Sequence, residues 1–115
     1  MAIPSVEPQN LAKSCNEALI LACLERGPRH GYQIALDIEE RAGPTFRFNH
    51  GTLYPILHKL EQEGLIKGTW SSEASSRRRK SYELTARGRR YAREQRDAWR
   101  VFIEHFLSAV EVDES

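Results

Sequence analysis

The fold of this chain is decided by the stretch FNHGTLYPILHKLEQEGLIKG, residues 48–68, which has the pattern of a helix followed by a strand. The apolar residues that recur at helical spacing are Leu53, Ile56, Leu57 and Leu60. Gly51 and Pro55, however, stand in the first turns, where glycine costs about 1 kcal/mol and proline removes a hydrogen bond. We expect a helix from Asn49 to Glu63 that runs through Pro55, with Thr52 as the alternative start.

Two helices are expected before this one. Asn10 can cap the first, whose apolar residues follow at alternating four- and three-residue steps until Gly27-Pro28 ends it. The second is expected over residues 31–42, where Gly43-Pro44 stops it. Residues 1–9 contain two prolines and no periodicity, which predicts a loose arm.

After the third helix the pattern changes to that of a β-hairpin. LIKGTWSS (65–72) and KSYELT (80–85) contain strand formers, and the polar segment EASSRRR (73–79) separates them. Thr85 can then cap a long helix over residues 86–110. The expected fold is therefore mainly α with one small hairpin.

Length and composition fit one globular domain. The chain has 115 residues, of which 40% are hydrophobic and 29% charged. It has no apolar run near the roughly 20 residues that span a bilayer and no secretory pattern at its start, so we expect a cytoplasmic protein that contacts no membrane. Cys15 and Cys23 lie eight apart in one helical pattern, which favours small core residues over a disulfide.

The charges are segregated along the chain although the net charge is only +1. Residues 77–100 hold ten basic and three acidic groups, whereas residues 101–115 hold four acids and no base, ending in an acidic tail at 111–115. The basic segment is a candidate contact for a polyanion. A solvated helix face with internal ion pairs is the alternative.

Enzyme chemistry finds no support in the motifs. The chain has no glycine-rich phosphate loop, no GxSxG elbow and no HExxH motif. Its histidines (His30, His50, His58, His105) and its two cysteines show no metal-ligand spacing. We expect no enzyme activity, no cofactor and no metal.

The order of the elements instead suggests DNA binding. Three helices, a short turn before the third and then a hairpin are the layout of a winged helix-turn-helix, whose third helix presents its N-terminal part to the major groove. The side chains at this helix start include no acid: Asn49, His50, Gly51, Thr52 and Tyr54. Gly51 then gives backbone access to the duplex. The alternative is a core helix whose poor start is only a loop.

The hairpin tip and the last helix add two further indications. Four consecutive cations, residues 77–80, repel one another but beside a duplex could reach phosphates; a solubilising loop is the alternative. The apolar face of the last helix from Trp99 onward is too wide for one small domain to cover, which predicts a homodimer. Packing wholly on its own domain is the alternative.

Three segments resemble the PadR family of bacterial transcriptional regulators: LILACLERGPRHGYQIALDIEERAG, FNHGTLYPILHKLEQEGLIKGTW and RRRKSYELTARGRRYAREQRDAW. The resemblance covers about residues 17–107, and GTLYPILHKLEQEGLI is its most specific motif. It implies a dimeric repressor of a palindromic operator, in many members released by a small molecule such as a phenolic acid or a planar aromatic drug. The single helix after the hairpin resembles the short-form subfamily.

The resemblance also implies site residues. DNA contacts would fall on Tyr32, Gln33, Asn49, His50, Thr52, Tyr54, Lys59, Arg77, Arg78 and Arg79. The dimer interface would include Leu11, Cys15, Trp99, Phe102, Ile103, Phe106 and Val110, and an aromatic effector would meet Trp99, Phe102 and Phe106.

The predicted organisation is an arm (1–9), a DNA-binding domain (10–84), a dimerisation helix (85–110) and an acidic tail (111–115). We expect double-stranded DNA and a second copy as partners, at the bacterial nucleoid. The alternative function is a winged-helix protein-interaction module without DNA binding, which leaves the cations at 77–80 unexplained.

Overall fold

The computed structural model describes residues 8–71 and 79–111. The helices are α1 (Pro8–Glu25), α2 (Gly31–Ala42), a short 3-10 turn η1 (Gly43–Thr45), α3 (His50–Gln62) and α4 (Ala86–Val110). The strands are β1 (Arg29–His30), β2 (Ile66–Trp70) and β3 (Lys80–Leu84). None of the helices in these two ranges is long and apolar enough to cross a membrane.

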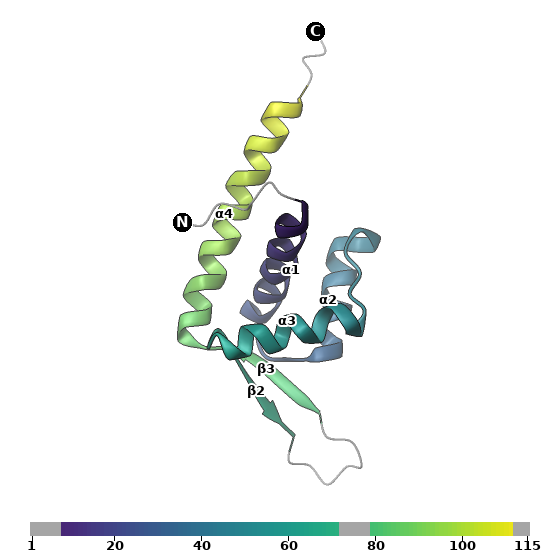
Figure 1. Cartoon of the computed structure of the whole chain (residues 1–115), viewed down its shortest axis with the longest axis vertical. Helices are drawn as coiled ribbons and strands as arrows, with labels where there is room; N and C mark the ends of the chain where they lie inside the picture. The colour runs from purple at the N-terminus through teal and green to yellow at the C-terminus, as the bar shows by residue number, and fades with distance from the viewer. Residues whose placement is uncertain (1–7, 72–78, 112–115) are drawn as a thin grey trace.

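The helices form a small bundle from which the hairpin and one helix project. Helix α3 lies across the lower ends of α1 and α2, and β2 and β3 extend below it (Figure 1). Helix α4 packs along α1, with Arg96 Nη1 2.7 Å from Glu25 Oε2, and then continues past the bundle (Figure 1). The molecule is consequently elongated, measuring 65 × 29 × 24 Å.

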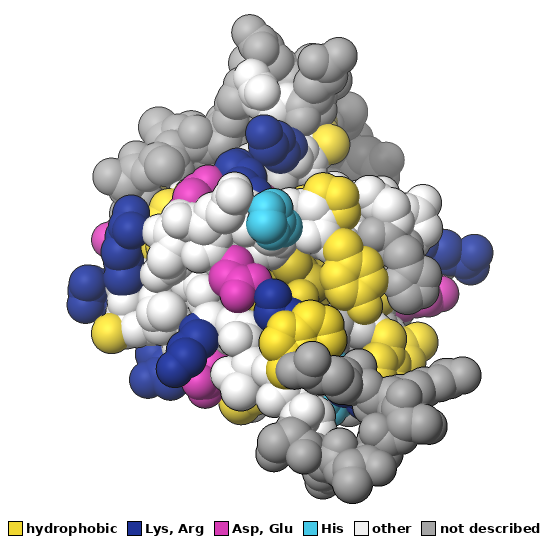
Figure 2. Space-filling view, turned by 60° about the horizontal axis from the view of Figure 1, so that its bottom comes forward, with side chains coloured by type: hydrophobic (Ala, Val, Ile, Leu, Met, Phe, Trp, Pro, Cys, Tyr) yellow, Lys and Arg dark blue, Asp and Glu magenta, His cyan; other side chains and the backbone are white. Residues whose placement is uncertain are grey.

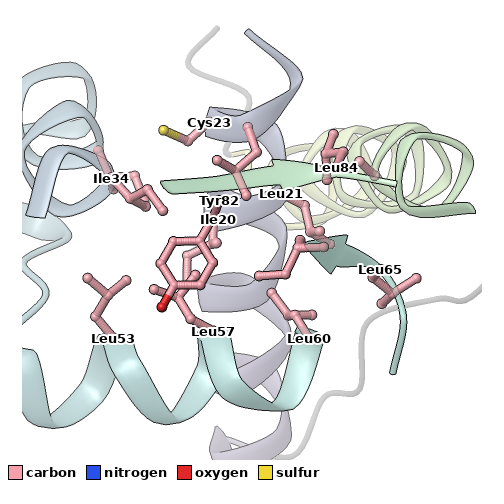
Figure 3. Close-up of a cluster of buried hydrophobic side chains, with 14 residues drawn as sticks. Ile20, Leu21, Cys23, Ile34, Leu53, Leu57, Leu60, Leu65, Tyr82 and Leu84 are labelled. Atoms are coloured by element: carbon pink, nitrogen blue, oxygen red, sulfur yellow. The ribbon is translucent and has the colours of Figure 1, made fainter. Parts of the chain in front are cut away.

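One face of α3 forms one side of the hydrophobic core. Leu53, Leu57 and Leu60 point toward α1 and β3 (Figure 3) and are at most 1% exposed. They meet Ile20 and Tyr82, which are also buried. The helical spacing in the sequence therefore marks the buried stripe, and this stripe fixes which side of α3 faces outward.

The third helix begins and ends one residue inside the predicted bounds. Asn49 is its N-cap, because its Oδ1 accepts a hydrogen bond from the N–H of Thr52 at 2.9 Å. The helix runs through Pro55, as predicted. Proline lacks the N–H that would bond the carbonyl of Gly51, and both residues are exposed, so solvent access limits the cost of this defect.

One prediction for the secondary structure is wrong. Helix α1 begins at Pro8, so Asn10 lies within the helix and does not cap it; proline suits a first helical position, where its missing N–H would have no helical partner. The predicted hairpin is confirmed, because β2 pairs with β3. The short strand β1, which was not predicted, pairs with β3 and makes a three-stranded antiparallel sheet of order β1-β3-β2. Helices α2 and α4 have the predicted bounds, and the side chain of Thr85 caps α4.

Helix α4 enters the fold through a close backbone contact. Thr85 Oγ1 accepts a hydrogen bond from Gly88 N at 3.0 Å and donates to Gly64 O at 2.7 Å. A Cβ atom built on Gly88 would lie 1.8 Å from the carbonyl oxygen of Leu65. Only glycine fits there, and this contact sets the start of α4 against the beginning of β2.

A charged cluster joins α1 to α2. The carboxylate of Asp37 is bonded to Arg26 and accepts a hydrogen bond from the Cys23 thiol at 3.1 Å. The hydrogen bond from Arg26 lowers the pKa of Asp37, whereas burial and Asp37 raise the pKa of Cys23 to about 12. The thiol stays protonated at neutral pH, and Cys15 and Cys23 are both free.

Candidate nucleic-acid interface

The first turn of α3 carries no acidic residue. Asn49, Thr52 and Tyr54 are exposed, which brings together three of the predicted contacts, and Gly51 between them is exposed too; the side chain of His50 lies outside what the structure describes. The helix start presents the positive end of the helix dipole. This surface therefore suits an anionic partner.

Tyr54 connects the start of α3 to the start of α2. Its ring packs over Gly31, where an added Cβ would lie 2.7 Å from the Tyr54 hydroxyl oxygen. Gly31 thus lets the two helix starts approach each other. Tyr32 and Tyr54 are both about two-fifths exposed, 41% and 40%.

Arg79 lies just before β3, at the loop end of the hairpin, and contacts the start of α2. Its Nη1 donates to the Tyr32 hydroxyl at 3.2 Å, and its guanidinium carbon lies 5.5 Å from the centre of the Tyr32 ring. This contact brings a predicted wing residue to the start of α2. Arg77 and Arg78 lie outside the described residues.

Two other predicted contacts have partners within the protein. The side-chain oxygen of Gln33 accepts a hydrogen bond from the backbone N–H of His30 at 2.9 Å, which is half of a capping box. The ammonium of Lys59 is bonded to Glu17 of α1 and lies 3.7 Å from Glu63, and the bond to Glu17 raises the pKa of Lys59. The structure therefore does not bring Lys59 to the exposed surface at the start of α3.

The face that carries α3 and the hairpin combines apolar and charged side chains (Figure 2). A group of hydrophobic side chains lies there with a lysine or arginine side chain among them, and other lysines and arginines lie toward the edges of the view. The exposed aromatic residues here are Tyr32 of α2, Tyr54 of α3 and Trp70 of β2, with Trp70 52% exposed. We call this face the α3–wing face; its described members at the helix start and hairpin are Tyr32, Asn49, Gly51, Thr52, Tyr54, Trp70 and Arg79.

A second candidate site is a groove between α1 and α4. It encloses about 520 Å³ and is lined by residues that include Cys15, Leu19, Trp99 and Ile103. A neighbouring hollow of about 360 Å³ shares Cys15 and Trp99 with it and is also lined by Leu11. The indole N–H of Trp99 is buried without a hydrogen-bond partner among the described residues.

Phe46, from the connector after η1, lines both hollows, although the sequence did not single it out. No periodic pattern marks a residue in such a connector, so only the three-dimensional structure identifies it.

The distal half of α4 presents the apolar face that the sequence predicts. Phe102 is half-buried and meets Trp99 edge to face, with ring centres 5.5 Å apart. Ile103, Phe106 and Val110 are each about half exposed. The described part of the chain therefore covers Phe102 in part and leaves the last three open. No cluster of potential metal ligands occurs among the described residues.

Together, the exposed start of α3, the hairpin beside it and the helix order define a winged helix-turn-helix protein. Residues 20–94 match the family model described as the transcriptional regulator PadR-like family. The chain belongs to this family and is a PadR-like transcription regulator. Members of this family are regulators and not enzymes.

Individual relatives agree with this assignment. Over 70 residues the chain is 33% identical to the negative transcriptional regulator PadR of Bacillus subtilis. The aligned residues cover 61% of this chain but only 38% of that protein. The crystal structure of a PadR family transcription regulator from Clostridium difficile is 35% identical, with a TM-score of 0.67 over 81% of this chain and 94% of the other.

Bacillus subtilis PadR has also been solved in complex with operator DNA; it is 29% identical, with a TM-score of 0.63 over 69% of this chain and 45% of the other. This chain thus spans less than half the length of that relative.

Proposed function

We propose that this protein is a homodimeric repressor that binds an inverted repeat in double-stranded DNA through the α3–wing face. The observation that carries the proposal is the exposed, acid-free start of α3 with Arg79 beside it. Support comes from the relative in Bacillus subtilis that was solved with operator DNA. Binding to a chromosomal operator places the protein at the nucleoid.

The predicted contacts fall into three groups in this proposal: the start of α3, the start of α2 and the wing. Asn49, His50, Thr52 and Tyr54 contact base edges or the flanking backbone from the start of α3. Tyr32 contacts phosphate from the start of α2, and Gly51 lets the backbone come close. Arg77, Arg78 and Arg79 bind phosphates or the minor groove from the wing.

The second copy is proposed to dock on the groove between α1 and α4. Ile103, Phe106 and Val110 of one subunit are apolar and about half exposed, and the groove they would fill is lined by Leu11, Cys15 and Trp99. Twofold symmetry makes this contact reciprocal, so each subunit fills the groove of the other. Two recognition helices then face two half-sites.

Selection of bound sequences from a random duplex library tests this function. We expect an inverted repeat whose half-sites lie about one helical turn, or a multiple of it, apart. The logarithm of the binding constant should fall linearly with the logarithm of salt concentration, and Arg78→Ala should reduce the slope by about 0.9. Lys13→Ala, which removes an exposed charge from α1, is the matched control and should leave the slope unchanged. Failure to bind any duplex at low salt would instead favour a protein-interaction module.

An aromatic effector is proposed to bind at the subunit interface beside Trp99, Phe102 and Phe106. The buried, unpartnered indole N–H of Trp99 and the largely apolar groove around it support this idea. In a Trp70→Phe background, Trp99 is the remaining tryptophan of the two in the chain. Titration with coumaric acid, a phenolic acid, or with a planar aromatic dye should then quench its fluorescence and weaken operator binding. Loss of DNA affinity without any change in the Trp99 emission would refute this location.

A further inference from the structure

Lys80 ends the run of four cations but does not extend away from the fold. Its Nζ donates a hydrogen bond to Glu61 Oε1 of α3 at 2.9 Å. The two side chains are only 24% and 31% exposed. The pair therefore links β3 to the outer face of the recognition helix.

Aromatic rings surround the ammonium group of Lys80. It lies 5.6 Å from the centre of the Trp70 ring and 5.4 Å from that of Tyr82. These groups, with Tyr54 and His58, line a hollow of about 440 Å³ between α3 and the hairpin. The bond to Glu61 raises the pKa of Lys80, which remains charged throughout the neutral range.

A glycine makes room for this arrangement. A Cβ atom on Gly68 would lie 2.2 Å from Lys80 Cε and 3.1 Å from Glu61 Oε2. Glycine weakens a strand interior, so its presence in the middle of β2 needs a reason. The reason is that the stem of Lys80 crosses the strand at this point on its way to Glu61.

The neighbouring residue Arg79 contacts a different helix. Arg79, just before β3, meets Tyr32 of α2, whereas Lys80, the first residue of β3, meets Glu61 of α3. The loop end of the hairpin is thereby held by both helices.

We propose that Lys80 and Glu61 form a brace that fixes the direction of the wing relative to α3. Lys80 is then a positioning residue and not a phosphate ligand. The function of this brace depends on the proposed DNA binding, because the brace holds the cations of the wing where they reach the duplex that α3 contacts.

The test compares Lys80→Met, which keeps the apolar stem, with Lys67→Met on the opposite, exposed face of the same hairpin. Binding is measured to the duplex recovered by selection, over a range of salt concentrations. We expect Lys80→Met to weaken binding by roughly tenfold, comparable to one lost positioned contact, with the salt slope unchanged. Lys67→Met should stay within about twofold of the wild type in affinity. Two results would overturn the proposal. If Lys80→Met reduces the slope of the salt dependence by about 0.9, Lys80 is a phosphate ligand. If Lys80→Met leaves the affinity unchanged, Lys80 has no role in binding.

Glu61→Gln is a second variant, for which the brace and the competing explanation predict opposite changes in affinity. If Glu61 only competes with DNA for Lys80, its neutralisation raises the affinity. The brace requires the affinity to fall, and the double variant Lys80→Met/Glu61→Gln to be no weaker than Lys80→Met alone. Additive losses would overturn the proposal.

Hydrogen exchange in the free protein separates this inference from the proposed function. In Lys80→Met, the backbone amides of Thr69 and Ser81, which face each other as a hydrogen-bonded pair of the β2–β3 ladder, should exchange about threefold faster, the scale of one partly exposed ion pair, while those of α1 remain unchanged. This result stands even if no duplex binds. Unchanged exchange at both amides would refute the brace whether or not DNA binding is found.

Discussion

Replacing Gly88 with alanine should lower the free energy of unfolding by about 3 kcal/mol, a large share of what a domain of this size has. The new Cβ would lie 1.8 Å from the Leu65 carbonyl oxygen, which is backbone and cannot rotate away. Helix α4 or the beginning of β2 must therefore move. Chemical denaturation followed by circular dichroism measures the loss.

Gly51→Ala is the matched control for this variant. Its new Cβ would meet only the side-chain oxygen of Asn49, at 3.3 Å, and alanine favours the helix. We expect the two effects to leave stability within about 1 kcal/mol of the wild type. If Gly88→Ala were as stable as Gly51→Ala, α4 would not enter the fold at this close contact.

Phe106→Asp should separate the proposed dimer and weaken binding to the inverted repeat by at least about 100-fold, because the second half-site contact is no longer intramolecular. Phe106 is 56% exposed, so the change leaves the core of its own chain intact. Binding to a single half-site should be unaffected. Sedimentation velocity measures the assembly, and fluorescence anisotropy with both duplexes measures the affinities.

Ser108→Asp introduces the same charge on the opposite side of α4, at an exposed position. It should leave both the assembly and the affinity unchanged. A Phe106→Asp protein that still sediments as a dimer at micromolar concentration would place the subunit interface elsewhere.

Local sequence patterns predicted the elements that local physics controls. The spacing of Leu53, Leu57 and Leu60 identified the buried face of α3. The cap at Thr85 and the stop at Gly43-Pro44 set the start of α4 and the end of α2. Each of these signals lies within a few residues of the structure that it determines.

The missed features depend on residues far apart in the chain. Strand β1 is two residues long and forms only because Arg29 and His30 pair with Tyr82 and Ser81. A pairing across about fifty residues leaves no trace in a local pattern.

The directions of lysine side chains were likewise not predictable from composition. Lys59 and Lys80 resembled DNA contacts because they are basic and lie near the recognition helix, yet they are bonded to Glu17 and Glu61. Lys80 is the first residue of β3, and its partner Glu61 is 19 positions away. For Lys59, the partner on α1 is 42 positions away, and neither separation leaves a local signal.

The distal turns of α4 extend past the bundle, with most of their apolar side chains half exposed. A helical segment of about ten residues is only marginally stable in water by itself. In the proposed dimer its order depends on the second chain, and thus on mass action. Dilution would then unfold the end of α4 and abolish DNA binding at the same time. The concentration of this regulator in the cell therefore helps to determine its structure.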